Sequence, residues 1–145
     1  MKIEVYCDGS GNTFESDGGY GYRVLIDGKI SHEGSGYLSS ATNNVAELTA
    51  AIEGLKSIQM GGYNTVCPPS TTEITLISDS QLTLGYASGR YQCKALHLTP
   101  LYIELRKLYK ELNCTQQWVK GHSGNEHNEA VDKLAGAARK NKGNI

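Results

Sequence analysis

The spacing of apolar residues changes along this chain, and that change restricts the fold more than any other feature of the sequence. The first forty residues alternate apolar and polar positions, which is the two-residue period of a β-strand. Strands are expected over residues 2–8 and over both arms of the segment 19–38, in which Asp27 and Gly28 form the centre. Because an Asp-Gly pair suits a type I′ turn, the two arms should form a hairpin.

Beyond residue 40 the apolar spacing is mostly the 3.6-residue period of helices. Helices are expected over residues 42–59, 80–89, 99–112 and 128–140, and strands over residues 72–79 and 115–121. Thr42 or Asn43 is a good cap for the first helix. Thr99 is expected to cap the third, with Pro100 at the first helical position.

This order of elements predicts the architecture. Strands that are separated by helices must cross over and run parallel, whereas three consecutive strands can form an antiparallel meander. The sequence therefore predicts an α/β fold with a mixed five-stranded sheet, of three antiparallel and then two parallel strands, on which the helices pack. The length of the chain fits a single domain over residues 1–145.

Composition excludes several classes of protein without indicating a function. The net charge is −1 with no long run of one sign, so charge alone does not indicate a nucleic-acid partner. The first residues, MKIEVYCDGSG, lack the apolar segment of a signal peptide, and no apolar run approaches a membrane span, so the cytoplasm is the expected compartment. Four cysteines at spacings that fit no zinc site are expected to be reduced thiols: Cys7, Cys67, Cys93 and Cys114.

One acidic residue of the expected helix 42–59 lies close to its apolar side. A rotation of about 100° per residue places Glu53 among polar residues, but it places Glu47 between Ala51 and Ile58. A single carboxylate at such a position usually reaches water at the edge of the buried face or meets a basic partner. The alternative is that other carboxylates meet Glu47 there and that a cation holds them together.

Three further acidic residues can reach the same place. Asp8 and Asp79 end expected strands, and in open α/β sheets ligands bind beyond the carboxyl ends of the strands. Asp132 lies near the apolar face of the last helix. Singly, the first two are typical turn formers, and Asp132 is a boundary charge beside Lys133. Together, four carboxylates repel strongly, and hard divalent cations such as Mg²⁺ or Mn²⁺ would neutralise them.

Four segments resemble ribonuclease H type 1, in the order YCDGSGN, TNNVAEL, SDSQL and VKGHSGNEHNEAVDKLA. The resemblance covers nearly the whole sequence and implies the ribonuclease H-like fold, which has the mixed sheet expected above. It also implies a metal-dependent endonuclease that hydrolyses the RNA strand of RNA-DNA hybrids by a two-metal-ion mechanism, leaving 5′-phosphate and 3′-hydroxyl ends. The implied cofactor is two Mg²⁺ ions, for which Mn²⁺ can substitute, and the implied partner is the hybrid duplex, bound by a monomer.

The resemblance also assigns roles to individual residues. The metal-binding catalytic carboxylates would be Asp8, Glu47, Asp79 and Asp132. A mobile catalytic residue for proton transfer and product release would be His122. Contacts to the minor groove would come from Asn43, Asn44 and Gln81, because amide groups can form hydrogen bonds with ribose 2′-hydroxyls and base edges. A contact to a DNA-strand phosphate would come from Thr42. Without the resemblance, these last five residues would be interpreted as helix caps or exposed surface.

The segment 86–100 departs from the family's pattern. Many relatives carry a basic, Trp-containing protrusion between the second and third helices. Here Arg90 and Lys94 are the only Lys or Arg residues of this segment, and it has no Trp. Weak binding of the hybrid is therefore expected, although the catalytic residues are intact.

Two alternative functions are left open. A catalytically silent hybrid-binding module would keep the fold, but it would have no reason to keep four carboxylates that repel one another. Another nuclease of this fold, such as a junction resolvase, is disfavoured by Asn43, Asn44 and Gln81, which suit recognition of 2′-hydroxyls.

Overall fold

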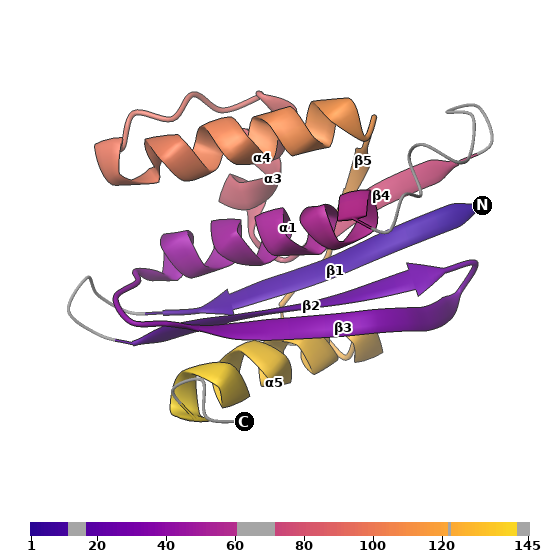
Figure 1. Ribbon diagram of the computed structural model, residues 1–145, viewed down its shortest axis with the longest axis horizontal. Helices are drawn as coiled ribbons and strands as arrows, with labels where there is room; N and C mark the ends of the chain where they lie inside the picture. The colour runs from indigo at the N-terminus through magenta and orange to yellow at the C-terminus, as the bar shows by residue number, and fades with distance from the viewer. Residues whose placement is uncertain (12–16, 61–71, 122, 142–145) are drawn as a thin grey trace.

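The computed structural model describes residues 1–11, 17–60, 72–121 and 123–141 (Figure 1). The strands are β1 (Lys2–Ser10), β2 (Gly18–Ile26), β3 (Lys29–Leu38), β4 (Glu73–Ser78) and β5 (Thr115–Trp118). The helices are α1 (Asn43–Met60), α3 (Gln81–Ser88), the 3-10 helix η2 (Leu96–Leu98), α4 (Thr99–Glu111) and α5 (Glu126–Asn141). Every expected strand and helix is present.

The strands form one mixed sheet in the order β3-β2-β1-β4-β5. β1 is antiparallel to β2 and β2 to β3, whereas β4 runs parallel to β1 and β5 parallel to β4. α1, α3 and α4 lie on one side of the sheet and α5 lies on the other (Figure 1). The predicted sheet is confirmed, and β1 and β4 are neighbours at its centre, so residues at the ends of these two strands can approach one another.

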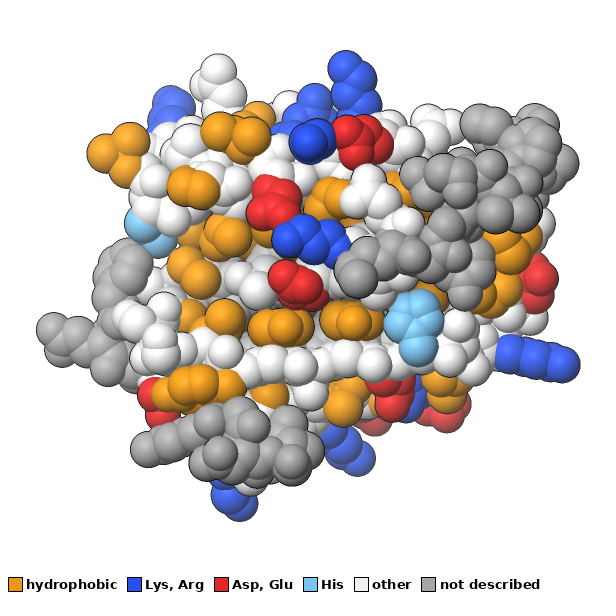
Figure 2. Space-filling model, in the orientation of Figure 1, with side chains coloured by type: hydrophobic (Ala, Val, Ile, Leu, Met, Phe, Trp, Pro, Cys, Tyr) orange, Lys and Arg blue, Asp and Glu red, His pale blue; other side chains and the backbone are white. Residues whose placement is uncertain are grey.

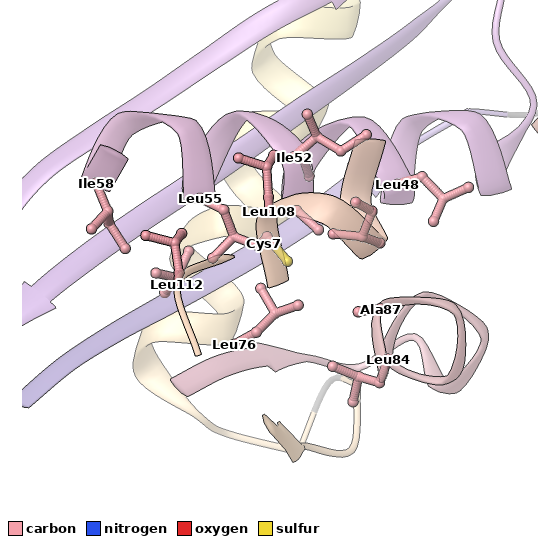
Figure 3. Close-up of a cluster of buried hydrophobic side chains, with 14 of the residues drawn as sticks. Cys7, Leu48, Ile52, Leu55, Ile58, Leu76, Leu84, Ala87, Leu108 and Leu112 are labelled. Carbon is pink, nitrogen blue, oxygen red and sulfur yellow. The ribbon is translucent and has the colours of Figure 1, made fainter. Parts of the chain in front are cut away.

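The side chains of β1 alternate between two cores. Ile3, Val5 and Cys7 are buried on the α1 side of the sheet, whereas Tyr6 points to the opposite side, toward α5. On the α1 side they meet apolar residues that recur along α1 at helical spacing, namely Leu48, Ile52, Leu55 and Ile58 (Figure 3). On the α5 side, Tyr6 packs with Leu25, Ile77 and Val131. Burial on both faces makes the centre of the sheet a rigid base for the ends of β1 and β4.

The polar face of α1 is turned toward α4 and solvent, as its phasing predicts. The Nζ of Lys56 lies 2.7 Å from Oε1 of Glu104 on α4 and 3.9 Å from Oε1 of Glu53. Acidic and basic side chains alternate between the two helices in the space-filling view (Figure 2). Glu53 therefore occupies the solvent side of the helix whose other side buries Glu47.

Turn and cap residues confirm most of the expected boundaries. Asp27 and Gly28 have positive φ values of 50° and 83°, as a type I′ turn requires. The hydroxyl of Thr42 accepts a hydrogen bond from the backbone amide of Val45 (3.3 Å), so Thr42 caps α1. The prediction that Thr99 caps α4 is wrong: its hydroxyl instead donates to the carbonyl O of Ala95 (3.1 Å), and α4 begins without a cap from any side chain.

Three strand ends differ from the sequence-based expectation, and the smallest difference is at β4, which ends at Ser78 rather than at Asp79. β1 does not end at Asp8: its antiparallel pairing with β2 continues through Asp8 opposite Gly21 to Ser10 opposite Gly19. β5 ends at Trp118 rather than Gly121. Within the described ranges, no helix is both long and apolar enough to cross a membrane.

Candidate active site

Three carboxylates from distant parts of the sequence meet at one end of the central strands. Asp8 lies near the end of β1, Glu47 in the second turn of α1, and Asp79 directly after β4. One oxygen from each lies within 4.8 Å of the others, which is close enough for all three to bind a single ion. The structure thus brings together three of the four predicted carboxylates.

Gly9 joins two of these carboxylates through its backbone. Its N–H group lies 2.9 Å from Oδ1 of Asp8 and 3.1 Å from Oε1 of Glu47, and it donates a hydrogen bond to each. A Cβ atom at this position would lie 2.3 Å from the carbonyl carbon of Ala46 and from the amide nitrogen of Glu47. Only glycine lets β1 and α1 approach so closely. Gly9 was not predicted as a site residue, because a Gly after an Asp is also what a turn requires.

Asp79 is held from the side of β5. The indole Nε1 of Trp118 donates a hydrogen bond to the carbonyl O of Asp79 (3.0 Å). A Cβ atom at Gly121 would lie 3.0 Å from the Oδ2 of Asp79, so the segment after β5 passes close to the carboxylate. Neither Trp118 nor Gly121 was predicted as a site residue, since both contacts depend on the position of β5 beside β4.

Asp132 approaches the cluster from α5, on the opposite side of the sheet from Glu47. It is not one of the three residues whose oxygens lie within 4.8 Å of one another. Its charge and its hydrogen-bonding contact nevertheless raise the pKa of Asp8, so the two carboxyl groups are close in space. The fourth predicted carboxylate thus adjoins the site at Asp8.

Burial and repulsion make this cluster unfavourable without a cation. Asp8 is 4% exposed and Glu47 is 5% exposed, and this burial is the main cause that raises the pKa of both carboxyl groups. The charge of Asp79 raises both pKa values further. When no cation is bound, protons on Asp8 and Glu47 would therefore reduce the negative charge of the cluster at neutral pH.

The donor set fits a hard divalent cation. The second carboxylate oxygen of Glu47, Oε2, is buried and has no hydrogen-bond partner among the described residues. A buried oxygen without a partner is costly, and a bound cation would satisfy it. A set made only of carboxylate oxygens suits Mg²⁺ or Mn²⁺ better than Zn²⁺, which is usually bound by Cys or His.

Comparison with known proteins identifies the family. The family model described as RNase H matches residues 1–140 of this sequence. The chain belongs to the RNase H family. All four sequence segments lie within the matched residues, so the resemblance is confirmed.

Individual relatives agree with this assignment. The Ribonuclease H of Prosthecochloris aestuarii (strain DSM 271 / SK 413) is 34% identical, over 97% of this chain and 97% of that protein. The structure of LC11-RNase H1, isolated from compost by a metagenomic approach, has a TM-score of 0.82 and 27% identity, covering 97% of each protein. LC11-RNase H1 in complex with an RNA/DNA hybrid has a TM-score of 0.81 and 26% identity, covering 97% of this protein and 98% of that one.

The structure describes four of the five other residues to which the RNase H resemblance gives a role. Asn43 and Asn44 are exposed in the first turn of α1, and Gln81 is exposed at the first position of α3, two residues after Asp79. Thr42 is half-buried and caps α1. His122 lies outside the described residues. The polar side chains of two helix starts are thus available beside the carboxylates.

Proposed function

We propose that this protein hydrolyses the RNA strand of RNA-DNA hybrids, leaving 5′-phosphate and 3′-hydroxyl ends. Membership of the RNase H family supports the reaction class. The single observation that carries the proposal is the convergence of the Asp8, Glu47 and Asp79 carboxylates, together with a buried Glu47 oxygen that has no hydrogen-bond partner among the described residues. A hybrid-binding module without catalysis would gain nothing from this repulsion.

Asp8, Glu47 and Asp79 would hold Mg²⁺, with Asp132 completing the site beside Asp8. Two bound divalent ions supply activation of water and stabilisation of the leaving oxygen during phosphodiester hydrolysis. The protein itself contributes the orientation of the carboxylates. The Gly9 N–H group holds Asp8 and Glu47 side by side, and the Trp118 indole restrains the backbone of Asp79.

Substrate recognition is assigned to the exposed side chains at the starts of α1 and α3. Asn43, Asn44 and Gln81 have both donor and acceptor groups, and these suit ribose 2′-hydroxyls and base edges in the minor groove. Thr42 would contact a phosphate of the DNA strand. His122 would transfer a proton and assist product release. A 2′-hydroxyl requirement distinguishes this activity from that of a DNA junction resolvase.

The test is incubation of the protein with Mg²⁺ and matched RNA-DNA, RNA-RNA and DNA-DNA duplexes of one sequence. We expect cleavage of the RNA strand of the hybrid alone, dependent on Mg²⁺, with a 5′-phosphate on the downstream product. Cleavage of the DNA-DNA duplex would favour another nuclease of this fold. Binding of the hybrid without cleavage at any Mg²⁺ or Mn²⁺ concentration would favour the silent module.

The same proposal places the enzyme in the cytoplasm as a monomer. Cys7, Cys93 and Cys114 are free thiols, as is usual in a reducing compartment, whereas Cys67 lies outside the described residues. Size-exclusion chromatography with light scattering would test the monomer, for which the expected mass is 15.7 kDa.

A further inference from the structure

The tryptophan at the end of β5 contacts the backbone of a site residue. Trp118 is opposite Ser78 in the parallel pairing of β4 with β5, one residue before Asp79. Its Nε1 donates to the Asp79 carbonyl O at 3.0 Å. The indole is nevertheless 47% exposed, so it contributes less to the core than a buried aromatic ring does. Its position is better explained by the contact with Asp79 than by packing.

Asp79 needs such a contact more than the other carboxylates do. Asp8 lies inside a paired strand and Glu47 inside a helix, so the ladder and the helix fix their backbones. Asp79 lies in the short connection between β4 and α3, and it is only half-buried. A carboxylate on a connection is less precisely placed than one on a strand or helix, unless other groups restrain it.

Other backbone contacts hold the residues next to Asp79. The backbone amide of Val119 donates to the carbonyl O of Ser78 (3.1 Å), which ends the pairing of β5 with β4. The backbone amide of Ser80 donates to the Ser78 hydroxyl (3.0 Å). The Asp79 carbonyl and the Ser80 amide belong to one peptide group, so the Ser78 hydroxyl holds its N–H end and the Trp118 indole holds its C=O end.

We infer that Trp118 is a positioning residue for the metal site: its indole N–H holds the peptide of Asp79 so that the carboxylate faces Asp8 and Glu47 before the cation arrives. A ligand that is already in place loses less freedom on binding, and that difference appears as affinity for the cation. This inference rests on the proposed metal site, and it adds a residue that touches neither the metal nor the substrate.

The test compares Trp118→Phe with Gln117→Ala by calorimetric titration of Mg²⁺ and Mn²⁺ without hybrid. Phe keeps an aromatic ring and removes the donor, and Gln117 is an exposed neighbour on the same strand. We expect Trp118→Phe to weaken metal binding about three- to tenfold, as the loss of one hydrogen bond predicts. Gln117→Ala should bind metal as the unmodified protein does.

Kinetics provide a second readout. In Trp118→Phe the metal concentration for half-maximal cleavage should rise by the same factor, while kcat at saturating metal stays near that of the unmodified enzyme. Unchanged metal affinity with a lower melting temperature would show a structural role only. Unchanged metal affinity with a raised KM for the hybrid would show that the exposed ring contacts substrate instead. Either result overturns the inference.

The unmodified protein offers a test that does not depend on a variant's folding, because Trp118 is its one tryptophan. Its fluorescence should change during Mg²⁺ titration with the midpoint found by calorimetry, and Asp79→Asn should abolish that change. Metal binding without any change in fluorescence would contradict the coupling of Trp118 to Asp79. If the unmodified protein bound no metal at all, the proposed function itself would fail.

Discussion

Two regions of this molecule contribute differently to the proposed reaction. The first is the carboxylate cluster of Asp8, Glu47 and Asp79, which lies on elements of the central core and is largely buried. The second, which we call the α3–α4 corner, consists of residues 89–95 together with Arg106. It overlaps the segment 86–100, which was expected to depart from the family's pattern, and most of it is exposed.

The α3–α4 corner is ordered by contacts to two glycines. The ring of Tyr91 lies against Gly85, where a Cβ atom would be 2.2 Å from it, and the guanidinium of Arg90 lies over that ring at 5.1 Å from its centroid. Arg106 lies against Gly89, and its Nη1 donates to the carbonyl O of Ala87 (3.1 Å). The corner therefore holds two guanidinium groups on a compact base, without a long protrusion.

We expect the carboxylate cluster to determine the rate of the chemical step and the α3–α4 corner to determine the affinity for the hybrid. The cluster depends on buried hydrogen bonds and short distances, so single substitutions there should have large effects that salt does not change. The corner offers exposed charges, whose interactions with a polyanion are weaker individually and are screened by salt.

The largest effect is expected from Asp79→Asn. The change removes a charged metal ligand, so we expect kcat to fall by more than the roughly 10²–10³-fold that loss of one oxyanion donor causes. The protein should remain folded, and without metal it should be more stable, because one repelling charge is gone. Single-turnover cleavage and thermal unfolding would measure the two effects.

A matched pair on α1 provides the control for that result. Glu47→Gln should inactivate the enzyme as Asp79→Asn does, whereas Glu53→Gln should leave the rate almost unchanged, because Glu53 is on the solvent side beside Lys56. If the Asp79→Asn variant kept near-normal turnover, Asp79 would be excluded as a metal ligand. Inactivation by Glu53→Gln but not by Glu47→Gln would contradict the position of the site on α1.

A smaller loss is expected from His122→Ala. Bound metal ions already lower the pKa of water, so a residue that only transfers a proton should contribute about 10²-fold, and no more than about 10⁴-fold. Rates of cleavage across pH would measure the contribution. A variant as inactive as Asp79→Asn would give His122 a larger role, and full activity would remove it from the site.

The metal-free protein should lose stability as pH rises. In the folded protein without cation, burial and the charges of Asp79 and Asp132 raise the pKa of Asp8 from 3.8 to about 7. Between these pH values the folded state keeps a proton that the unfolded state releases, so the free energy of unfolding falls with rising pH. The fall from this group should be at most about 4 kcal/mol, at 1.36 kcal/mol per pKa unit.

Thermal unfolding of the unmodified protein and of Asp8→Asn, each in EDTA, would isolate this effect. As pH rises from about 4 to about 7, we expect the free energy of unfolding of the unmodified protein to fall relative to that of Asp8→Asn. Added Mg²⁺ should stabilise the unmodified protein most at the upper end of that range. A free energy of unfolding that rose relative to that of Asp8→Asn in EDTA would contradict the raised pKa.

The smallest effects are expected at the α3–α4 corner. The unmodified protein should bind hybrid weakly, with a shallow dependence of affinity on salt, because Arg90 and Lys94 are its only Lys or Arg residues in the segment 86–100. Gln92→Lys should tighten binding severalfold and steepen the slope of log K against log salt by about 0.9, with little change in kcat. Fluorescence anisotropy at several salt concentrations would measure the slope.

Gln59→Lys makes the same change at the opposite end of α1 from the site and serves as the control. It should leave the slope unchanged. If the unmodified protein already bound hybrid tightly with a steep salt dependence, another basic surface would carry the substrate. The exposed end of α4 near Lys110 would be the first place to test.

The sequence predicted the sheet and the acidic site well because both produce strong local patterns. Alternating strands, an Asp-Gly turn and an acidic residue on an apolar helix face can be read without knowing the tertiary structure. Glu47 is the clearest case, since its helical phase placed it correctly at the core before its partners were known.

The residues that were missed act through backbone groups. Trp118 donates a hydrogen bond to the carbonyl of Asp79, and Gly9 is required by the close approach of β1 to α1. Neither role changes the local spacing of apolar and polar residues. The error at Thr99 has a related cause, because a threonine hydroxyl can donate backward to a carbonyl as easily as it can accept from a helix. Asp8 was placed at a strand end because the continuation of β1 depends on its pairing with β2.

The most direct test of the metal site is anomalous diffraction from crystals of the protein with bound hybrid and Mn²⁺. We expect two Mn²⁺ peaks about 3.5–4 Å apart, with carboxylate oxygens of Asp8, Glu47 and Asp79 as ligands. Peaks located elsewhere on the protein, or no peak in contact with these three residues while hybrid is bound, would contradict the proposed site.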